Sequence, residues 1–182
     1  MTARIALIGL SGAGKSTVAP LLAQRLGFGC IDLDEAVARA EGTPVAEILT
    51  LRGEDAFREI EAGALREALE GEESARGVVV ACGAGILARN ENRALLRSSA
   101  YVVWLTVTPE TAAHRLEGSE AAARPLLRGG PVASRLRELL EARRGLYEEA
   151  ANAAVETDDR EPEQVAEGVR MVWKGAWGSS GS

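Results

Sequence analysis

Gly9-Leu10-Ser11-Gly12-Ala13-Gly14-Lys15-Ser16-Thr17 decides the fold of this 182-residue chain, because it matches the phosphate-binding pattern G-x-x-x-x-G-K-[ST]. The apolar run 4–8 before it predicts a short buried strand, and residues 18–26 after it carry apolar side chains at helical spacing. In such a strand–loop–helix unit, glycines let successive backbone N–H groups turn inward, and the helix N-terminus adds positive potential. We therefore expect this loop to bind a nucleotide.

Two polar side chains of the loop are expected to bind the phosphates and the metal ion. Lys15 would reach the β- and γ-phosphates, and the Ser16 hydroxyl would ligate Mg²⁺. Lys15 and Lys174 are the only lysines among 21 basic residues, so a compact ammonium is kept where a guanidinium would not fit. The alternative interpretation is a glycine-rich turn that binds no ligand.

Composition narrows the class of protein. Hydrophobic residues make up 46% and charged residues 26% of the chain, as is usual for a soluble globular domain. The net charge of −6 argues against a nucleic-acid partner, and no apolar run is long enough for a membrane span. Without a signal peptide we expect a cytoplasmic protein, and we expect a monomer. Cys30 and Cys82 have no metal or redox spacing, so two buried, reduced thiols are predicted.

Strand and helix patterns alternate along the chain. Further strands are expected at 29–31, 78–81, 101–105 and 153–156. A short helix is expected after Asp34, ending at about residue 41, and further helices at 44–53, 54–69, 90–96, 109–116, 134–149 and 162–173. This alternation predicts an α/β fold, with a parallel sheet covered by helices on both faces. Residues 1–173 are expected to form a single domain, the glycine-rich segment 117–131 a mobile lid, and residues 174–182 a flexible tail.

Three charged residues fall on apolar helix stripes. Arg58 and Glu61 lie one turn apart on the inner side of helix 54–69, and Arg143 lies on the stripe of helix 134–149. They could form a buried ion-pair network that only joins helices, or each Arg stem could lie at the core edge with its head in water. Beside a phosphate loop, they favour a polar pocket for a small acidic substrate, because an Arg fork holds a carboxylate bidentately.

Two further stretches follow predicted strands. Asp32 and Asp34 come at the carboxyl end of strand 29–31, the edge where α/β sheets bind ligands. One Asp could serve Mg²⁺ and the other could accept a proton from an alcohol; alternatively, Asp34 is only a helix N-cap. Gly83-Ala84-Gly85 follows strand 78–81 and could offer backbone N–H groups, although alone it could also be a loose turn.

Taken together, these motifs resemble those of the shikimate kinase family over about residues 4–173. The phosphate loop alone is shared by a very large superfamily. The Asp32/Asp34 pair, Gly-Glu-x-x-Phe-Arg-x-x-Glu at 53–61, Gly83-Ala84-Gly85, Arg-Pro-Leu-Leu at 124–127 and Arg143 ahead of Leu146-Tyr147 are more specific in this order. The resemblance implies a nucleoside-monophosphate-kinase-like P-loop fold, with a five-stranded parallel sheet in the order 2-3-1-4-5.

The resemblance also implies a reaction and its residues. The family transfers the γ-phosphoryl group of ATP to the 3-hydroxyl of shikimate, in aromatic amino-acid biosynthesis. Carried over, Lys15, Asp34 and Arg124 are expected to be catalytic, with Asp34 as the base and Arg124 closing over the phosphates. Mg²⁺ would be bound by Ser16 and, through water, by Asp32. ATP would be held by Gly12, Ala13, Gly14, Lys15, Ser16, Thr17, Arg115, Arg124 and Arg160; shikimate would be held by Asp34, Arg58, Glu61, Gly83, Ala84, Gly85 and Arg143.

The chain departs from the family pattern twice. Ala84 stands where the family has a glycine, and it fits only if its φ is negative and its Cα is not packed against. Gly145 stands where the family tends to have Pro, which could loosen the helix near Arg143. Two other functions stay open. One is a kinase of the same architecture with another acceptor, such as gluconate or a nucleoside monophosphate, and the other is a nucleotide-binding regulatory module in which Ala84 has abolished turnover.

Overall fold

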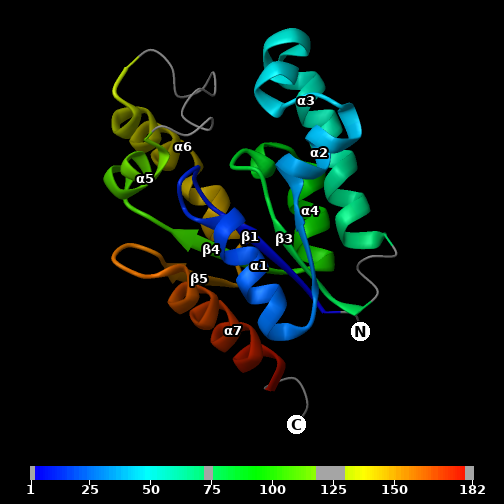
Figure 1. The fold of residues 1–182 in the computed structure, drawn as a ribbon, viewed down its shortest axis with the longest axis vertical. Coiled ribbons are helices and arrows are strands. Elements are labelled where there is room, and N and C mark those ends of the chain that lie inside the picture. The colour runs from blue at the N-terminus through cyan, green and yellow to red at the C-terminus, as the bar shows by residue number, and fades with distance from the viewer. Residues whose placement is uncertain (1–2, 72–75, 118–129, 179–182) are drawn as a thin grey trace.

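Five parallel strands form the centre of the molecule, in the order β2-β3-β1-β4-β5 (Figure 1). The computed structural model describes residues 3–71, 76–117 and 130–178. The strands are β1 (Arg4–Ile8), β2 (Gly29–Asp32), β3 (Val78–Ala81), β4 (Tyr101–Thr106) and β5 (Ala153–Glu156). The α/β class predicted from the sequence and the strand order implied by the family resemblance are both confirmed.

Helices connect these strands and cover both faces of the sheet (Figure 1). They are α1 (Lys15–Leu26), α2 (Leu33–Glu41), α3 (Val45–Glu70), the 3₁₀ helix η2 (Ile86–Ala88), α4 (Asn90–Ser99), α5 (Pro109–Leu116), α6 (Val132–Ala150) and α7 (Pro162–Gly178). Within the described ranges, no helix combines the length and the apolar character needed to cross a membrane.

The alternation of side chains along β1 divides the core between the two faces. Ile5 and Leu7 are fully buried in a cluster that includes α1 and α7, whereas Ala6 and Ile8 are buried in a second cluster with α3, α4 and α6. Both faces of a parallel sheet are apolar because crossover helices cover both of them. The central strand is therefore fixed from two sides, and so is the loop that follows it.

Several boundaries differ from those predicted. The two helices expected at 44–53 and 54–69 are joined as α3, with a kink at Gly53, whose φ of 81° is left-handed. Helix α7 continues to Gly178, so residues 174–178 are helical and the predicted tail is wrong there. Most of the expected lid, including Arg124, lies at 118–129, outside the described residues, as does the end of the tail at 179–182.

The prediction of two buried thiols is wrong for one of them. Cys82 is buried behind β3, but Cys30 is exposed, and both are free. Cys30 lies on β2, which is the edge strand of the sheet, so one side of that strand has no neighbour to cover it.

Helix α6 runs without a break through Gly145, so the glycine does not interrupt the segment that carries Arg143. A methyl group added at Gly145 would meet no atom within 4 Å. The same is true of Gly27, but that residue ends α1 with a φ of +68°, which L-residues avoid. Both positions thus have room for a methyl group, but only Gly145 has a backbone conformation that suits an L-residue.

We predict that Gly145→Ala raises the free energy of unfolding by about 0.5–1 kcal/mol, because Ala has the higher helix propensity. Gly27→Ala, the matched control, should lower it by about 1 kcal/mol through left-handed strain. Urea denaturation of both variants measures the two values. A destabilised Gly145→Ala protein would contradict the account of α6.

Candidate active site

Two cavities lie where β1, β2 and β3 end, so the loops that follow these three strands form their shared wall. The first has a volume of about 270 Å³ and is lined by Leu10, Ser11, Asp34, Val45, Leu49, Glu54, Phe57, Arg58, Glu61, Gly83, Ala84, Gly85, Leu136, Leu139 and Arg143. The second, of about 950 Å³, follows the glycine loop and is lined by residues 11–18 and by side chains of α5 and of the segment 157–165. This is the edge at which open α/β sheets bind ligands.

The glycine loop is held tightly against its surroundings. Gly9, Gly12 and Gly14 all have positive φ, and a Cβ at Gly12 would stand 2.5 Å from the carbonyl oxygen of Ala112. The Lys15 ammonium donates to the carbonyl oxygens of Gly9 at 2.9 Å and Leu10 at 2.8 Å. The loop therefore has the conformation that its glycines predict, with the ammonium at the wall of the larger cavity.

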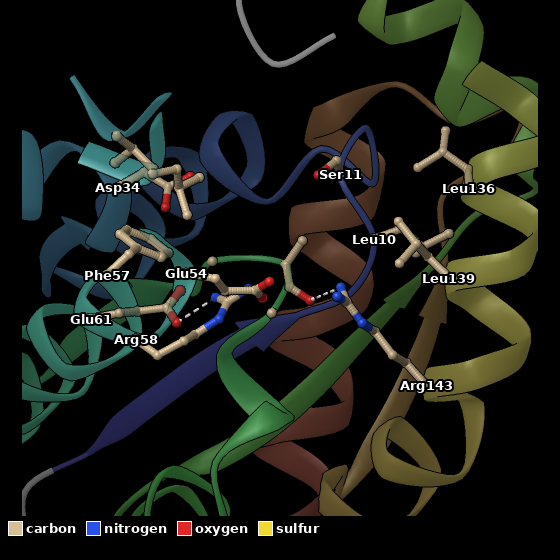
Figure 2. Close-up of a pocket in the computed structure, with 15 residues that line it drawn as sticks. Leu10, Ser11, Asp34, Glu54, Phe57, Arg58, Glu61, Leu136, Leu139 and Arg143 are labelled. Carbon is tan, nitrogen blue, oxygen red and sulfur yellow. Dashed lines mark hydrogen bonds and ion pairs between the residues drawn. The ribbon is translucent and has the colours of Figure 1, made fainter. Parts of the chain in front are cut away.

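A buried ion pair forms one wall of the smaller cavity. Arg58 Nη1 lies 2.7 Å from Glu61 Oε2, and Arg58 Nη2 lies 3.0 Å from Glu54 Oε1 (Figure 2). Glu61 is only 1% exposed. Burial acts to lower the pKa of Arg58, but the two carboxylates outweigh burial and raise the pKa above its ordinary value. Arg58 therefore keeps its charge inside the protein.

The ion pair explains the glycines that face it. A Cβ at Gly83 would lie 2.2 Å from Glu61 Oε1, and a Cβ at Gly85 would lie 2.1 Å from Arg58 Nη2. Neither glycine has a left-handed φ, so close approach requires glycine here and backbone strain does not. Ala84 also lacks a positive φ, so the backbone condition for an alanine at this position is met.

Arg143 reaches the same segment from the opposite side. Figure 2 shows Arg58 extending from α3 and Arg143 from α6 toward the 83–85 segment between them. Arg143 Nη1 donates to the carbonyl oxygen of Ala84 at 3.0 Å. The three charged residues that sequence patterns place on inner helix faces thus meet around one cavity, and two of them are a guanidinium pair suited to a carboxylate.

The N-cap of the helix that follows β2 is not Asp34, the residue that the sequence suggested for this alternative role. Asp32, rather than Asp34, is the N-cap of α2: its Oδ1 accepts from the backbone N–H groups of Asp34 at 2.9 Å and Glu35 at 3.3 Å. Capping fixes the Asp32 carboxylate at the wall of the larger cavity. Asp34, in the first turn of the helix, lines both cavities.

The larger cavity contains the remaining residues expected to bind nucleotide. Arg115 and Arg160 both line it, together with Gly12 to Thr17. Arg115 is anchored by hydrogen bonds to Thr157, at 2.9 Å to its hydroxyl and 2.6 Å to its carbonyl oxygen. The α5 helix that carries Arg115 is in turn capped by Thr108, whose hydroxyl and N–H donate to Asp158. Partial burial acts to raise the pKa of Asp158, but the hydrogen bonds from Thr111 and Thr108 and the charge of Arg115 together lower it.

The two cavities meet at three residues, Ser11, Asp34 and Ala84, which line both of them. A ligand group in the smaller cavity can therefore approach a ligand group in the larger one beside Asp34. The described residues contain no cluster of three or more acidic, His or Cys side chains that could hold a metal ion by themselves. A metal here would have to share its coordination with phosphate oxygens and water, as Mg²⁺ commonly does.

Sequence patterns miss the apolar part of the smaller cavity. Leu136 and Leu139 of α6 line one side of it. Val45, Leu49 and Phe57 come from the other side, on α3. Periodicity identifies such residues as inward-facing, but whether they border a cavity depends on how α3 and α6 are spaced.

We predict that Gly83→Ala lowers the free energy of unfolding by about 1–3 kcal/mol, the usual cost of overpacking. The added methyl group can be accommodated only if Glu61 moves, which separates it from Arg58. Gly63→Ala is the matched control on α3, since a methyl group there meets no atom within 4 Å. Denaturant unfolding measures both; equal stability of the two variants would contradict this packing.

Comparison with known proteins agrees with this geometry. A family model described as shikimate kinase matches residues 11–172. A shikimate kinase from Streptomyces coelicolor is 46% identical over 163 residues, covering 90% of this chain and 91% of that protein. One from Symbiobacterium thermophilum is 41% identical over 161 residues, covering 88% and 90%. The solved shikimate kinase from Acinetobacter baumannii, in complex with shikimate, superimposes with a TM-score of 0.88 at 31% identity, covering 97% of this chain and 95% of that one. The chain belongs to the shikimate kinase family.

Proposed function

We propose that this chain transfers the γ-phosphoryl group of ATP to the 3-hydroxyl of shikimate, giving shikimate 3-phosphate and ADP. Membership of the family supports the reaction class, and the shikimate bound in a structural relative supports the acceptor. The observation that carries the proposal is the position of Asp34. It lines both cavities, so an acceptor hydroxyl and a terminal phosphate can meet beside one carboxylate.

In this proposal the smaller cavity holds shikimate. Arg58 and Arg143 reach it from opposite walls and would hold the substrate carboxylate between them. Glu61 would orient Arg58 through their 2.7 Å ion pair. Gly83, Ala84 and Gly85 would line the ring through their backbone. Acidic residues on the wall offset part of the positive charge, so the two guanidiniums bind without an excess of buried charge.

Transfer then needs little covalent chemistry from the protein. The 3-hydroxyl oxygen forms a bond to the γ-phosphorus, the bond from that phosphorus to the β,γ-bridging oxygen breaks, and ADP leaves with that oxygen. The hydroxyl proton passes to the Asp34 carboxylate. Positioning the two oxygens in line and neutralising the equatorial charge would supply most of the rate.

The larger cavity would hold ATP. Gly12, Ala13, Gly14, Lys15, Ser16 and Thr17 surround the expected phosphate position, and Lys15 would exchange its bonds to loop carbonyls for phosphate oxygens. Arg115 and Arg160 line the part assigned to adenine. Ser16 and the fixed carboxylate of Asp32 fit Mg²⁺, which would neutralise charge on the transferring phosphoryl group.

Other expectations stay predictions. They are the closure of Arg124 over the phosphates with the lid 117–131, the single kinase domain over 1–173, the cytoplasmic location and the monomeric state. The regulatory alternative rested on Ala84 as a lesion. Its backbone has no positive φ, so backbone strain at Ala84 gives no reason for lost turnover.

We predict acceptor-dependent ADP release with shikimate, measured in a coupled assay, and none above background with gluconate or AMP. The guanidinium pair could also hold the carboxylate of gluconate, so the expected preference for shikimate is supported by membership of the shikimate kinase family and by the shikimate bound in a structural relative. Release with gluconate alone would favour the other small-molecule kinase. No release with any acceptor would favour the regulatory module.

Arg143→Lys should raise the shikimate KM about tenfold and leave the ATP KM nearly unchanged, because a Lys cannot form the bidentate contact. Arg144→Lys is the matched control, since Arg144 is the next residue on α6 and is exposed. Steady-state kinetics with each substrate varied separately measures both. An unchanged shikimate KM in Arg143→Lys would remove this residue from the carboxylate site.

A further inference from the structure

The carbonyl oxygen of Ala84 has two donors, and only one of them lines the substrate cavity. Arg143 Nη1 donates to it at 3.0 Å and the Tyr147 hydroxyl donates to it at 3.2 Å. The two donors lie four residues apart on α6, so they are neighbours on one face of the helix. Arg143 is among the residues that line the smaller cavity, whereas Tyr147 is not.

Tyr147 is held more firmly than Arg143. Its side chain is 1% exposed, and its ring stacks on Trp104 of β4, with centroids 5.3 Å apart and planes 16° from parallel. Burial raises the pKa of Tyr147, although Arg143 acts to lower it through its charge and a hydrogen bond. The hydroxyl consequently keeps its proton at neutral pH and remains a donor fixed to the sheet.

Arg143 has two hydrogen-bond acceptors to serve in the proposed reaction, the Ala84 carbonyl and the substrate carboxylate. It bonds the Ala84 carbonyl in this structure, and it would bond the substrate carboxylate in the complex. Turning a guanidinium N–H toward the substrate withdraws a donor from Ala84, and an unsatisfied, part-buried carbonyl is costly. A second donor that stays in place lowers the free-energy cost of this exchange, because the carbonyl keeps one hydrogen bond.

We propose that Tyr147 is a positioning residue for shikimate: its hydroxyl retains the Ala84 carbonyl, and with it the 83–85 segment, when Arg143 turns to the substrate carboxylate. The inference rests on the proposed function. Ala84 itself borders both cavities, but Gly83, Gly85 and Arg143 line only the smaller one, and the nucleotide is expected on the loop 12–17. The effect should therefore be larger for shikimate than for ATP.

The chain provides a matched pair of variants, because its only other tyrosine makes the same kind of contact elsewhere. The Tyr101 hydroxyl donates to the carbonyl oxygen of Val172 at 3.2 Å, between β4 and α7 and away from both cavities. Tyr147→Phe and Tyr101→Phe each remove one hydroxyl and one hydrogen bond to a backbone carbonyl while keeping the ring.

We predict that Tyr147→Phe raises the shikimate KM about 3- to 10-fold, the range given by one neutral hydrogen bond. The ATP KM and kcat should stay within about twofold, and Tyr101→Phe should leave all three values within about twofold. Steady-state kinetics and calorimetric titration with shikimate measure the effect, with circular dichroism reporting the fold of each variant. A purely structural hydroxyl would not produce this split between the two substrates.

Three results would overturn the inference. They are an unchanged shikimate KM in Tyr147→Phe, an equal rise in both KM values, and loss of the fold in Tyr147→Phe, which would assign the hydroxyl to stability. Failure of the proposed function has a different signature: the unsubstituted protein itself would then show no ADP release with shikimate, and this inference would fall with it.

Discussion

A buried guanidinium held by a buried carboxylate is the constraint on which the acceptor side of this molecule depends. Arg58 and Glu61 lie one turn apart on α3 and form a 2.7 Å ion pair away from water. Removing either partner would leave a buried charge, which costs several kcal/mol. Gly83 and Gly85 are glycines because the pair occupies the space that a Cβ would need. One ion pair thus fixes α3, the end of β3 and a charged wall of the cavity.

The nucleotide side depends on a different constraint, the conformation of the loop after β1. Gly9, Gly12 and Gly14 adopt positive φ, and Gly9 and Gly12 pass too close to neighbouring carbonyl groups for any side chain. Because β1 is the central strand and is buried on both faces, this loop is anchored by the whole sheet. Asp34, Ser11 and Ala84 then join the two sides, since they border both cavities.

Much of this arrangement could be predicted from the sequence, because two strong periodicities and one motif determine it. Strand alternation, the phosphate loop and the charges on the inner faces of α3 and α6 all give local signals. The role of Asp32 as the N-cap could not be separated from that of Asp34, since either residue suits the position. The exposure of Cys30, the length of α7 and the second donor to Ala84 depend on strand order or tertiary contacts, which single-sequence patterns do not contain.

The most direct test of the account is a crystal structure with shikimate and a non-hydrolysable ATP analogue bound together. We predict that the shikimate carboxylate lies within hydrogen-bond distance of both Arg58 and Arg143, that Arg58 keeps its bond to Glu61, and that the 3-hydroxyl lies against Asp34 and faces the terminal phosphate. A shikimate carboxylate bound away from both guanidiniums, or a 3-hydroxyl that points away from Asp34, would contradict it.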